Sequence, residues 1–435
     1  MNNNPRIIYV GLIGYGTVGA GVVKLLEMRK NYIRNRFNTE FVIKTICDLA
    51  IEEKDKTGIE SAKLTTNYEE IVTDPEINVV IELIGGLTPA KDIVMKSLRA
   101  KKHVITANKA LISDSGKELF EFARKQNCHL FFESSVGAGI PIIKSMTEGV
   151  VGNKFNGIYG IVNGTCNYIL TEMTKKGFSF VQALKEAQKK GYAESDPTLD
   201  INGMDSAHKL AILIYLAFGK KIKATDMYME GITQIAQMDI EHATKLNYTI
   251  KLLAIAKKES DEIEARVHPI LISNDNPLAS INGVYNAVFF DCDPLGSILL
   301  SGEGAGQMAA ASGVVSDLIN LSGKEPNANL FCNLYDENEK LKIRKIDNVK
   351  TKFYIRFMAI DKPGVLATLA GVLGDHDISI NSVSQKAHDK MSAVPVVMLT
   401  DFATEGMLRD ALEKIQKLPI TKGDPVAIRI MEQLW

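Results

Sequence analysis

Ile7-Ile-Tyr-Val-Gly-Leu-Ile13-Gly14-Tyr-Gly16-Thr-Val-Gly19 is the stretch that decides the fold of the N-terminal part of the chain. An apolar run of strand length is followed by a glycine loop and then by helical spacing of apolar residues. Gly14 permits a tight turn, Gly16 lets the backbone approach a pyrophosphate, and Gly19 lets helix and strand pack closely. The pattern predicts strand, loop and helix, with the helix N-terminus facing the phosphates of a dinucleotide.

The sequence that follows supports this interpretation. Further buried-strand patterns at 41–47, 79–84, 103–106 and 129–133 alternate with helical patterns at 89–100 and 116–125. Such alternation predicts a parallel, doubly wound sheet of the Rossmann type. A glycine loop of purely structural use is the alternative, and this context disfavours it.

The end of the second predicted strand bears on the choice of cofactor. An acid there would hydrogen-bond the ribose diol of NAD, so Asp48 favours NAD slightly. However, it lies 29 residues after Gly19 instead of about twenty. Lys44, Lys54 and Lys56 are also close enough to receive the 2′-phosphate of NADP. The sequence therefore predicts a nicotinamide dinucleotide without deciding which one.

Composition excludes several other classes of protein. The 435 residues are enough for two or three domains, and 51 basic residues balance 52 acidic ones. We therefore expect neither nucleic acid nor a membrane as a partner. The five cysteines are far apart and form no CxxC pair, which suits a reducing compartment without a zinc site. The N-terminus lacks the pattern of a signal peptide, so we expect a cytoplasmic protein.

A second informative stretch runs from Glu194 to Lys209 and contains four acids and one lysine. Pro197 disfavours helical geometry in the residue before it, so 194–200 should be an extended loop, with a helix from Ile201 onward. Asp205 and Lys209 then share one helix face. A run of apolar residues follows Lys209, a setting in which the pKa of a lysine can be tuned for proton transfer. Taken alone, the stretch fits an ordinary surface salt bridge better.

Several turns lie where ligands bind sheets of this kind. Ile84-Gly85-Gly86 and Thr106-Ala-Asn-Lys109 follow two strands at the edge of the crevice. The segment 133–141 leaves the last strand of the first sheet through small residues. Its carbonyls could hold a monovalent cation, although a glycine hinge explains the residues better. Asn163-Gly164-Thr165 can receive a carboxylate or merely cap a helix.

The middle of the chain predicts an α+β domain. We expect strands at 157–162, 249–256, 263–272, 284–290 and 297–300, and helices at 168–175, 180–190 and 201–218. The turn Gly302-Glu-Gly304-Ala-Gly306 opens a helix through about residue 320. Its small residues suit close packing. A returning helix of this kind would rejoin the first domain and bring the turn near the nicotinamide, although packing alone explains the composition as well.

The tail of the chain predicts a third unit. Residues 321–350 are mostly polar and are interpreted as a connecting segment. Strands at 353–360, 378–385, 394–400 and 426–431 and helices at 364–375 and 405–418 then follow in the order βαββαβ. This order is typical of a ferredoxin-like domain.

Six motifs, taken in order across about the first 320 residues, resemble those of homoserine dehydrogenase. The last two of them, joined, are the most specific. The motifs are Gly14-x-Gly16-Thr-Val-Gly19, Ile84-Gly85-Gly86, Thr106-Ala-Asn-Lys109, Val162-Asn-Gly-Thr165, Gly191-Tyr-Ala-Glu-x-Asp-Pro197 and Asp200-x-x-Gly-x-Asp205-x-x-x-Lys209.

The resemblance implies NAD(P)-dependent interconversion of L-homoserine and L-aspartate 4-semialdehyde, in the branch that leads to threonine, methionine and isoleucine. Hydride arriving at the aldehyde carbon leaves charge on oxygen, which an ammonium group can stabilise and protonate. The resemblance makes Lys209 this acid/base, and makes Glu194, Asp200 and Asp205 the acids that hold the substrate or orient the lysine. It also implies substrate contacts at Lys109, Gly164, Thr165 and Tyr192.

The resemblance further implies where cofactor and cation bind. It implies a sodium ion on the carbonyls of Glu133, Val136, Ala138 and Ile140, which reverses the preference for a hinge there. Where NADP-preferring relatives often carry a basic residue, this chain has Cys47-Asp48. The expected cofactor contacts are Gly14, Gly16, Thr17, Val18, Gly19, Asp48, Ile84, Gly85, Thr106, Lys109, Gly304 and Gly306.

The tail resembles an ACT domain, the small amino-acid-binding module of biosynthetic enzymes. The matching motifs are Asp361-Lys-Pro-Gly-Val-Leu-Ala367 and Ile378-Ser-Ile-Asn-Ser-Val-Ser-Gln385. The resemblance implies an effector site at Asp361, Gly364, Val365 and Asn381, and we expect feedback inhibition by L-threonine. The alternative is a dimerisation module without a ligand, because fold alone does not fix function.

These expectations define four segments and a homodimer or homotetramer. The segments are a Rossmann domain at 1–136 completed by the helix at 305–320, a catalytic and dimerisation domain at 137–320, a linker at 321–350 and an ACT domain at 351–435. Two other functions remain open at this point. One is a different NAD(P)-dependent oxidoreductase, and the other is an amino-acid sensor without catalysis.

Overall fold

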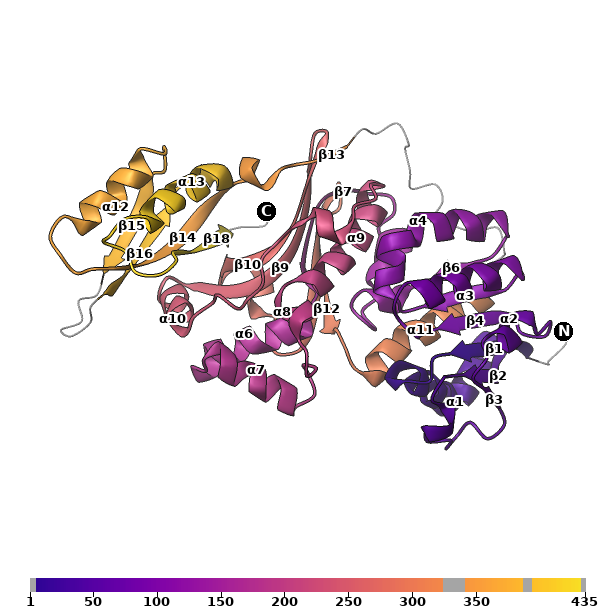
Figure 1. Ribbon diagram of the computed structural model, residues 1–435. Coiled ribbons are helices and arrows are strands. Elements are labelled where there is room, and N and C mark those ends of the chain that lie inside the picture. Colours follow the sequence, from indigo (N-terminus) through magenta and orange to yellow (C-terminus); the bar gives the residue numbers. More distant parts are fainter. Residues whose placement is uncertain (1–4, 324–340, 386–392, 432–435) are drawn as a thin grey trace.

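The computed structural model describes residues 5–323, 341–385 and 393–431. The α/β class and the three units expected from the sequence are both confirmed. Figure 1 shows the first unit (indigo to purple) and the C-terminal unit (orange to yellow) at opposite ends of the molecule, with a central sheet between them.

The first unit is a parallel sheet in the order β3-β2-β1-β4-β5-β6. Its inner strand β4 is buried at every position and rich in valine and isoleucine, as expected for a sheet covered on both faces. The strands are β1 (Arg6–Ile13), β2 (Thr39–Cys47), β3 (Lys63–Thr65), β4 (Val79–Glu82), β5 (His103–Thr106) and β6 (Leu130–Phe131). The helices are α1 (Thr17–Phe37), α2 (Glu69–Thr73), α3 (Thr88–Arg99) and α4 (Lys109–Lys125).

Two boundaries in this unit differ from the prediction, and the short elements β3 and α2 were not predicted. Helix α4 begins at Lys109 instead of residue 116, because the side chain of Asn108 caps it by accepting a hydrogen bond from the Leu111 amide at 3.0 Å. The expected strand at 129–133 is reduced to β6, because Glu133–Ser135 form a 3₁₀ turn, η2.

The glycine loop has the geometry that its sequence predicts. Gly14 has a φ of +99°, and a Cβ there would lie 2.7 Å from the backbone of Leu83. A Cβ at Gly16 would instead meet open space. The backbone of this turn can therefore be approached closely by a ligand at the N-terminus of α1.

The central unit is an antiparallel sheet in the order β12-β11-β7-β9-β10, with helices packed against it. Helix α10 and the short elements α5, α8 and β8 were not expected, because their few apolar residues form no clear period. The strands are β7 (Lys154–Ile161), β8 (Tyr228–Met229), β9 (Tyr248–Glu259), β10 (Glu262–Ser273), β11 (Tyr285–Asp293) and β12 (Gly296–Glu303). The helices are α5 (Ile142–Lys144), the π-helical turn η3 (Ser145–Gly149), α6 (Gly164–Lys176), α7 (Phe180–Lys189), α8 (Thr198–Ile201), α9 (Met204–Phe218) and α10 (Gln237–Lys245).

The predictions of an extended loop at 194–200 and of a continuous helix from residue 201 are each wrong in part. Helix α8 starts directly after Pro197, because proline disfavours helix in the residue before it but not in those after it. The carboxylate of Asp196 accepts from the Thr198 amide at 3.1 Å and supports that start. Gly203, with a φ of +92°, then breaks the chain before α9 begins at Met204.

Helix α11 (Gln307–Ser322) returns to the first unit as expected and packs against α1. A Cβ on Gly21 of α1 would lie 2.7 Å from the Gln307 carbonyl, so the two helices meet at very short range. Val314 and Leu318 of α11 belong to the hydrophobic core of the first unit. The glycine turn before α11 is thereby held over the crevice of the first sheet.

The C-terminal unit has the expected βαββαβ order and joins the central sheet. Strand β18 pairs in parallel with β10, with Ile270 opposite Arg429, so the two sheets are continuous. This fusion was not expected. The elements are β14 (Lys350–Ala359), α12 (Val365–Gly374), β15 (Ile380–Gln385), β16 (Val394–Thr400), β17 (Ala403–Thr404), α13 (Glu405–Gln416) and β18 (Val426–Met431).

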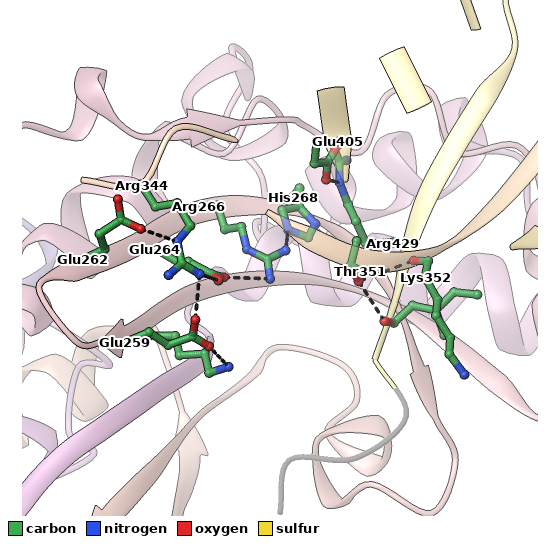
Figure 2. A network of polar contacts seen from close by, with 12 residues as sticks. Glu259, Glu262, Glu264, Arg266, His268, Arg344, Thr351, Lys352, Glu405 and Arg429 are labelled. Carbon is green, nitrogen blue, oxygen red and sulfur yellow. Dashed lines mark hydrogen bonds and ion pairs between the residues drawn. The ribbon is translucent and has the colours of Figure 1, made fainter. Parts of the chain in front are cut away.

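The expected linker is partly ordered structure. Strand β13 (Lys342–Ile343) pairs with β10, and Arg344 forms ion pairs with Glu259, Glu262 and Glu264 (Figure 2). This polar segment was interpreted as a connection, but the charge of Arg344 is matched by three glutamates at the end of the central sheet. The remainder of the predicted linker, 324–340 with Cys332, lies outside the described residues.

Buried ion pairs link the C-terminal unit to the central one, and we call this region the junction. Arg429 of β18 bonds Glu405 of α13, as Figure 2 shows, and also Glu230 of the central unit. Arg356 of β14 donates to Asp239 of α10 at 2.6 and 3.1 Å. The junction consists of Tyr228, Glu230, Asp239, Tyr354, Arg356, Glu405 and Arg429.

Candidate active site

A cleft of about 510 Å³ lies between the first and the central units. It collects residues from segments far apart in the sequence, namely the start of α1, the starts of α4 and α6, the start of α9 and the turn before α11. The sequence-predicted residues that line it are Thr17, Val18, Lys109, Ala138, Gly164, Thr165, Tyr192, Asp200, Asp205, Lys209, Gly304 and Gly306.

The centre of the cleft is a carboxylate between two ammonium groups. Lys209 donates to Asp205, one helical turn earlier, at 2.8 Å and to the Val162 carbonyl at 2.6 Å. The other oxygen of Asp205 pairs with Lys109 from the first unit. Lys209 and Asp205 are buried, whereas the Lys109 side chain is 43% exposed. The surface salt bridge that the isolated stretch suggested is therefore wrong.

The electrostatics of this trio favour proton transfer by Lys209. Burial lowers the pKa of Lys209, and the positive charge of Lys109 lowers it further, while Asp205 opposes the change. Burial would raise the pKa of Asp205, but the two lysines hold it well below its usual range. Asp205 therefore stays ionised while Lys209 can lose a proton more easily than an ordinary lysine.

Asn163 connects this trio to a second acid. Its amide nitrogen donates to Asp200 at 2.7 Å and to Asp205 at 2.9 Å, and its oxygen caps α6 by accepting from the Cys166 amide at 2.8 Å. Burial raises the pKa of Asp200. The sequence left a carboxylate site and a helix cap both open at Asn163 and did not indicate its bonds to the two acids, because the spacing to them, 37 and 42 residues, carries no local signal.

One hydrogen bond joins the loop at Gly164 and Thr165, which is expected to contact the substrate, to the segment 191–194. The Thr165 hydroxyl donates to the Tyr192 carbonyl at 2.6 Å, so both residues stay at the cleft. Glu194, expected to contact the substrate, is exposed and does not line the cleft. Its negative charge nevertheless acts on Lys109, whose pKa is raised because this charge, Asp200 and above all Asp205 outweigh burial.

The cofactor side of the cleft is built from backbone. Thr17 and Val18 begin α1, and Gly304 and Gly306 face them from the turn before α11. Gly304 must be glycine, because a Cβ there would overlap the carboxamide of Asn286. Asn286 is fully buried, and its carboxamide has no hydrogen-bond partner among the described residues. Three further predicted contacts do not line the cleft but form the glycine loop next to it, namely Gly14, Gly16 and Gly19.

Asp48 is used differently from the simplest expectation. One carboxylate oxygen accepts from the Tyr15 amide of the glycine loop at 2.7 Å, and the other accepts from the Ala50 amide at 2.9 Å. Asp48 therefore ties the end of β2 to the glycine loop. A ribose hydroxyl would have to share an oxygen that already accepts a backbone hydrogen bond.

A buried glutamate that the sequence did not single out supports the neighbouring turns. Glu82, at the end of β4, accepts from the Ile84 amide at 2.9 Å and the Gly85 amide at 3.3 Å, and the Thr106 hydroxyl donates to it at 2.6 Å. The Thr106 side chain is therefore committed to Glu82 and does not line the cleft. Burial raises the pKa of Glu82.

The predicted cation ligands lie together at the hinge between the units, with most of their carbonyls already engaged. The Ala138 carbonyl accepts from the Ser134 hydroxyl at 3.2 Å, and the Ile140 carbonyl accepts from the Ile142 amide at 2.7 Å. The Glu133 carbonyl accepts from the Val136 amide at 3.4 Å. Within the described ranges, no group of three or more His, Cys, Asp or Glu side chains could hold a metal ion.

The predicted effector residues gather at one end of the C-terminal unit. Gly364, with a φ of +88°, precedes α12, and Val365 is its buried first residue. The Gln385 side chain donates to Asp361 at 3.3 Å, which brings this turn next to β15, where Asn381 is exposed. In the described part of the chain, no helix has the length and apolar character needed to cross a bilayer.

Comparison with known proteins agrees with this geometry. A family model described as homoserine dehydrogenase matches residues 141–319, its NAD-binding domain matches 14–133, and an ACT domain matches 353–420. The homoserine dehydrogenase of Synechocystis is 40% identical over 440 residues, covering 98% of this chain and 99% of the relative.

Solved structures agree as well. A homoserine dehydrogenase from Thiobacillus denitrificans matches with a TM-score of 0.91 and 38% identity over 99% of both chains. A hyperthermophilic archaeal homoserine dehydrogenase in complex with NADPH matches 74% of this chain and 99% of its own, with a TM-score of 0.62 and 28% identity. The cleft, the NAD(P)-binding unit and these matches show that the chain belongs to the homoserine dehydrogenase family and carries an ACT domain.

Proposed function

We propose that Lys209 is the acid/base of the homoserine dehydrogenase reaction and that Asp205 keeps it in place. The observation that carries this proposal is the trio of Lys109, Asp205 and Lys209, in which one buried carboxylate holds the buried Lys209 and the partly exposed Lys109 at the edge of the cleft. The Lys209 ammonium has three N–H donors, and among the described residues two acceptors are bonded to it. Its third donor can serve the substrate oxygen.

The division of labour in the cleft follows from charge. A nicotinamide cofactor, when bound, supplies or accepts the hydride at the substrate carbon. Lys209 gives a proton to the developing alkoxide of the semialdehyde or takes it from the homoserine hydroxyl. Lys109 adds positive charge next to that oxygen, while Asp200 and Glu194 offer negative charge to the substrate ammonium group. Gly164, Thr165 and Tyr192 complete the proposed substrate contacts.

Turnover of L-aspartate 4-semialdehyde, followed through the absorbance of NADPH or NADH, tests the assignment. Lys209→Met should lower kcat by about 10² to 10⁴-fold, the usual contribution of a general acid, with little change in cofactor affinity. Lys189→Met on the exposed end of α7 is the matched control and should be fully active. A Lys209→Met enzyme within threefold of the wild type would refute the role of Lys209.

For the cofactor, we propose contacts at the glycine loop and at the two turns that face it. Open space at Gly16 and the N-terminus of α1 at the cleft fit a pyrophosphate. The proposed contacts are those predicted from sequence, including Asp48, Ile84, Gly85 and the backbone at Thr106. Rates with NADH and NADPH at equal concentration decide the preference, and Asp48→Ala should alter the ratio if Asp48 reads the ribose.

Sodium at the hinge remains part of the proposal. The carbonyls of Glu133, Val136, Ala138 and Ile140 lie in one short segment. This segment also carries the buried side-chain carboxylate of Glu133, whose pKa is raised by burial to about 7. A cation nearby would stabilise the ionised form of this carboxylate. Activity and melting temperature in sodium salts should exceed those in tetramethylammonium salts, and equal values would remove sodium from the proposal.

For regulation, we propose that L-threonine inhibits the enzyme through Asp361, Gly364, Val365 and Asn381. The left-handed turn at Gly364 leaves backbone amides at the N-terminus of α12, which suits an amino-acid carboxylate. Asn381→Ala should raise the threonine concentration needed for half-inhibition, with unchanged activity in its absence. We also propose the boundaries at residues 136, 320 and 350 and a homodimer or homotetramer, which light scattering can measure.

A further inference from the structure

Lys251 is a buried lysine that the proposed chemistry does not use. It lies on β9 with 1% of its surface exposed, and among the described residues no carboxylate forms an ion pair with it. Its ammonium group donates to the Asn167 side-chain oxygen at 3.0 Å, to the Ile281 carbonyl and to the Asn282 side-chain oxygen at 3.2 Å. Three acceptors thus match the three donors of the protonated lysine.

The partners of Lys251 fasten one loop to helix α6. Asn167, in the second turn of α6, donates to the carbonyls of Ile281 and Tyr285 at 3.1 and 3.0 Å. One turn later, the Thr171 hydroxyl accepts from the Gly283 amide at 3.0 Å. The loop 281–285 is therefore held along its whole length, and Lys251 is the group that bonds both the loop and Asn167.

This loop forms part of the wall of the active-site cleft. Val284 lines the cleft, and its carbonyl lies so close to Gly164 that a Cβ on that glycine would be 2.8 Å away. Gly164 is flanked by Asn163, which holds Asp200 and Asp205, and by Thr165. A displacement of the loop would therefore reach the proposed substrate contacts directly.

We propose that Lys251 is a positioning residue that sets the substrate affinity of the cleft by clamping the loop 281–285 against α6. The proposal rests on the substrate site proposed above. Burying an ammonium group without a carboxylate partner costs free energy of folding, and a methionine of similar length would avoid that cost. Burial and the neighbouring Lys175 accordingly lower the pKa of Lys251 to about 7. The presence of a lysine here is explained by its hydrogen bonds to three oxygens, which belong to the loop 281–285 and to Asn167.

The test is Lys251→Met in the full-length enzyme. We expect KM for L-homoserine to rise about tenfold, because the variant loses the three hydrogen bonds with which the charged ammonium holds the loop. kcat should stay within threefold and the dissociation constant of the cofactor within twofold, because Lys209 and the glycine loop are untouched. Hydrogen–deuterium exchange of 277–286 should become faster, while exchange in β1 stays the same.

Matched variants separate positioning from a general effect on folding. Lys257→Met changes a lysine on the same strand that is 44% exposed and pairs with Glu259, and it should leave KM unchanged. Asn167→Leu should raise KM as Lys251→Met does, and the double variant should be no worse than either, because both act on one loop. If Lys251→Met does not fold, Asn282→Ala, which removes one acceptor from the clamp, should still raise KM about threefold.

The outcomes separate this inference from the proposed function. An unchanged KM in folded Lys251→Met, equal losses of substrate and cofactor affinity, or additive effects in the double variant would overturn the role of Lys251. Absence of turnover in the wild type would refute the proposed function instead. In that case hydrogen–deuterium exchange of 277–286 still tests whether Lys251 holds the loop 281–285, because this measurement needs no activity. Unchanged exchange in Lys251→Met would overturn that role of Lys251.

Discussion

The cleft and the junction both bury charged side chains, but they differ in how fully those charges are satisfied. At the junction, Arg429 donates to both oxygens of Glu405, to Glu230 and to the Tyr228 hydroxyl, and Asp239 receives Arg356 twice and the Tyr354 hydroxyl. In the cleft, Lys209 has two bonded acceptors for three donors among the described residues. At the junction each buried charge is matched by several bonded partners, whereas Lys209 in the cleft keeps, within the described part of the chain, one donor for a further partner.

This difference explains why charges at the junction can stabilise the fold while Lys209 in the cleft can transfer a proton. Burial opposes the charge of Arg429, yet the hydrogen bonds that it donates to Glu405 and Glu230 and the negative charges of these partners raise its pKa, so it remains a cation at every relevant pH. Lys209, which is bonded to one carboxylate and has a second lysine nearby, has its pKa lowered by burial. Two charged networks of similar composition can therefore serve rigidity in one place and proton transfer in the other, and each can be disturbed separately.

After Lys209 itself, Asp205→Asn should produce the largest effect on the cleft. The substitution keeps the shape but removes the charge that orients both lysines, so kcat should fall by about 10² to 10³-fold, as for loss of an electrostatic contact in a reaction site. Steady-state kinetics measure it, and Asp226→Asn, on an exposed turn, serves as the control. A kcat within fivefold of the wild type would contradict a special role for the cleft network.

Arg356→Met should produce the largest effect on the junction. It leaves Asp239, which is fully buried, without its cation, and this should cost about 3 to 5 kcal/mol of unfolding free energy. Urea unfolding measures the loss, and kcat of the folded fraction should stay near the wild-type value. Adding Asp239→Asn should restore part of the stability, because the uncompensated charge is gone. An inactive but stable Arg356→Met enzyme would reverse the assignment of roles.

The pH dependence of the two reaction directions sharpens the comparison. Reduction of the semialdehyde needs protonated Lys209, so its rate should fall as pH rises through the lowered pKa of this lysine, below the ordinary value of about 10.4. Oxidation of homoserine needs the neutral amine, so its rate should rise over the same interval. Lys109→Met removes a charge that lowers the pKa and should move both profiles to higher pH. Unmoved profiles would disprove the coupling.

Glu230→Gln should have the smallest effect. The Glu230 side chain is 38% exposed, and Arg429 keeps its buried partner Glu405, so the loss should be about 0.5 to 1 kcal/mol. Glu405→Gln, at a side chain only 10% exposed, should cost several times more. Both are measured by urea unfolding. Equal costs would show that the junction does not depend on the burial of its charges.

Local patterns predicted the site as far as backbone geometry could. Gly14 and Gly19 were predicted from the space that a turn and a close packing require. The four-residue period of a helix put Asp205 and Lys209 on one face, but their place in the site came from the resemblance to a family. The short helix α8 and the early start of α4 were missed, because a proline or an asparagine decides them and not an apolar period. Glu82 and Asn163 were missed as supports, because their partners are distant in the sequence.

By itself, the sequence determined the longer strands and most helices, the glycine loop and the helix that carries Lys209, since these depend on residues within a few turns of one another. Only the tertiary structure decided that Lys109 meets Asp205 across the two units, that β18 extends the central sheet, and that Lys251 bonds a loop thirty residues away in sequence. Such contacts depend on packing between distant segments. The chemistry of buried charge at the cleft and at the junction therefore emerges only in the folded chain.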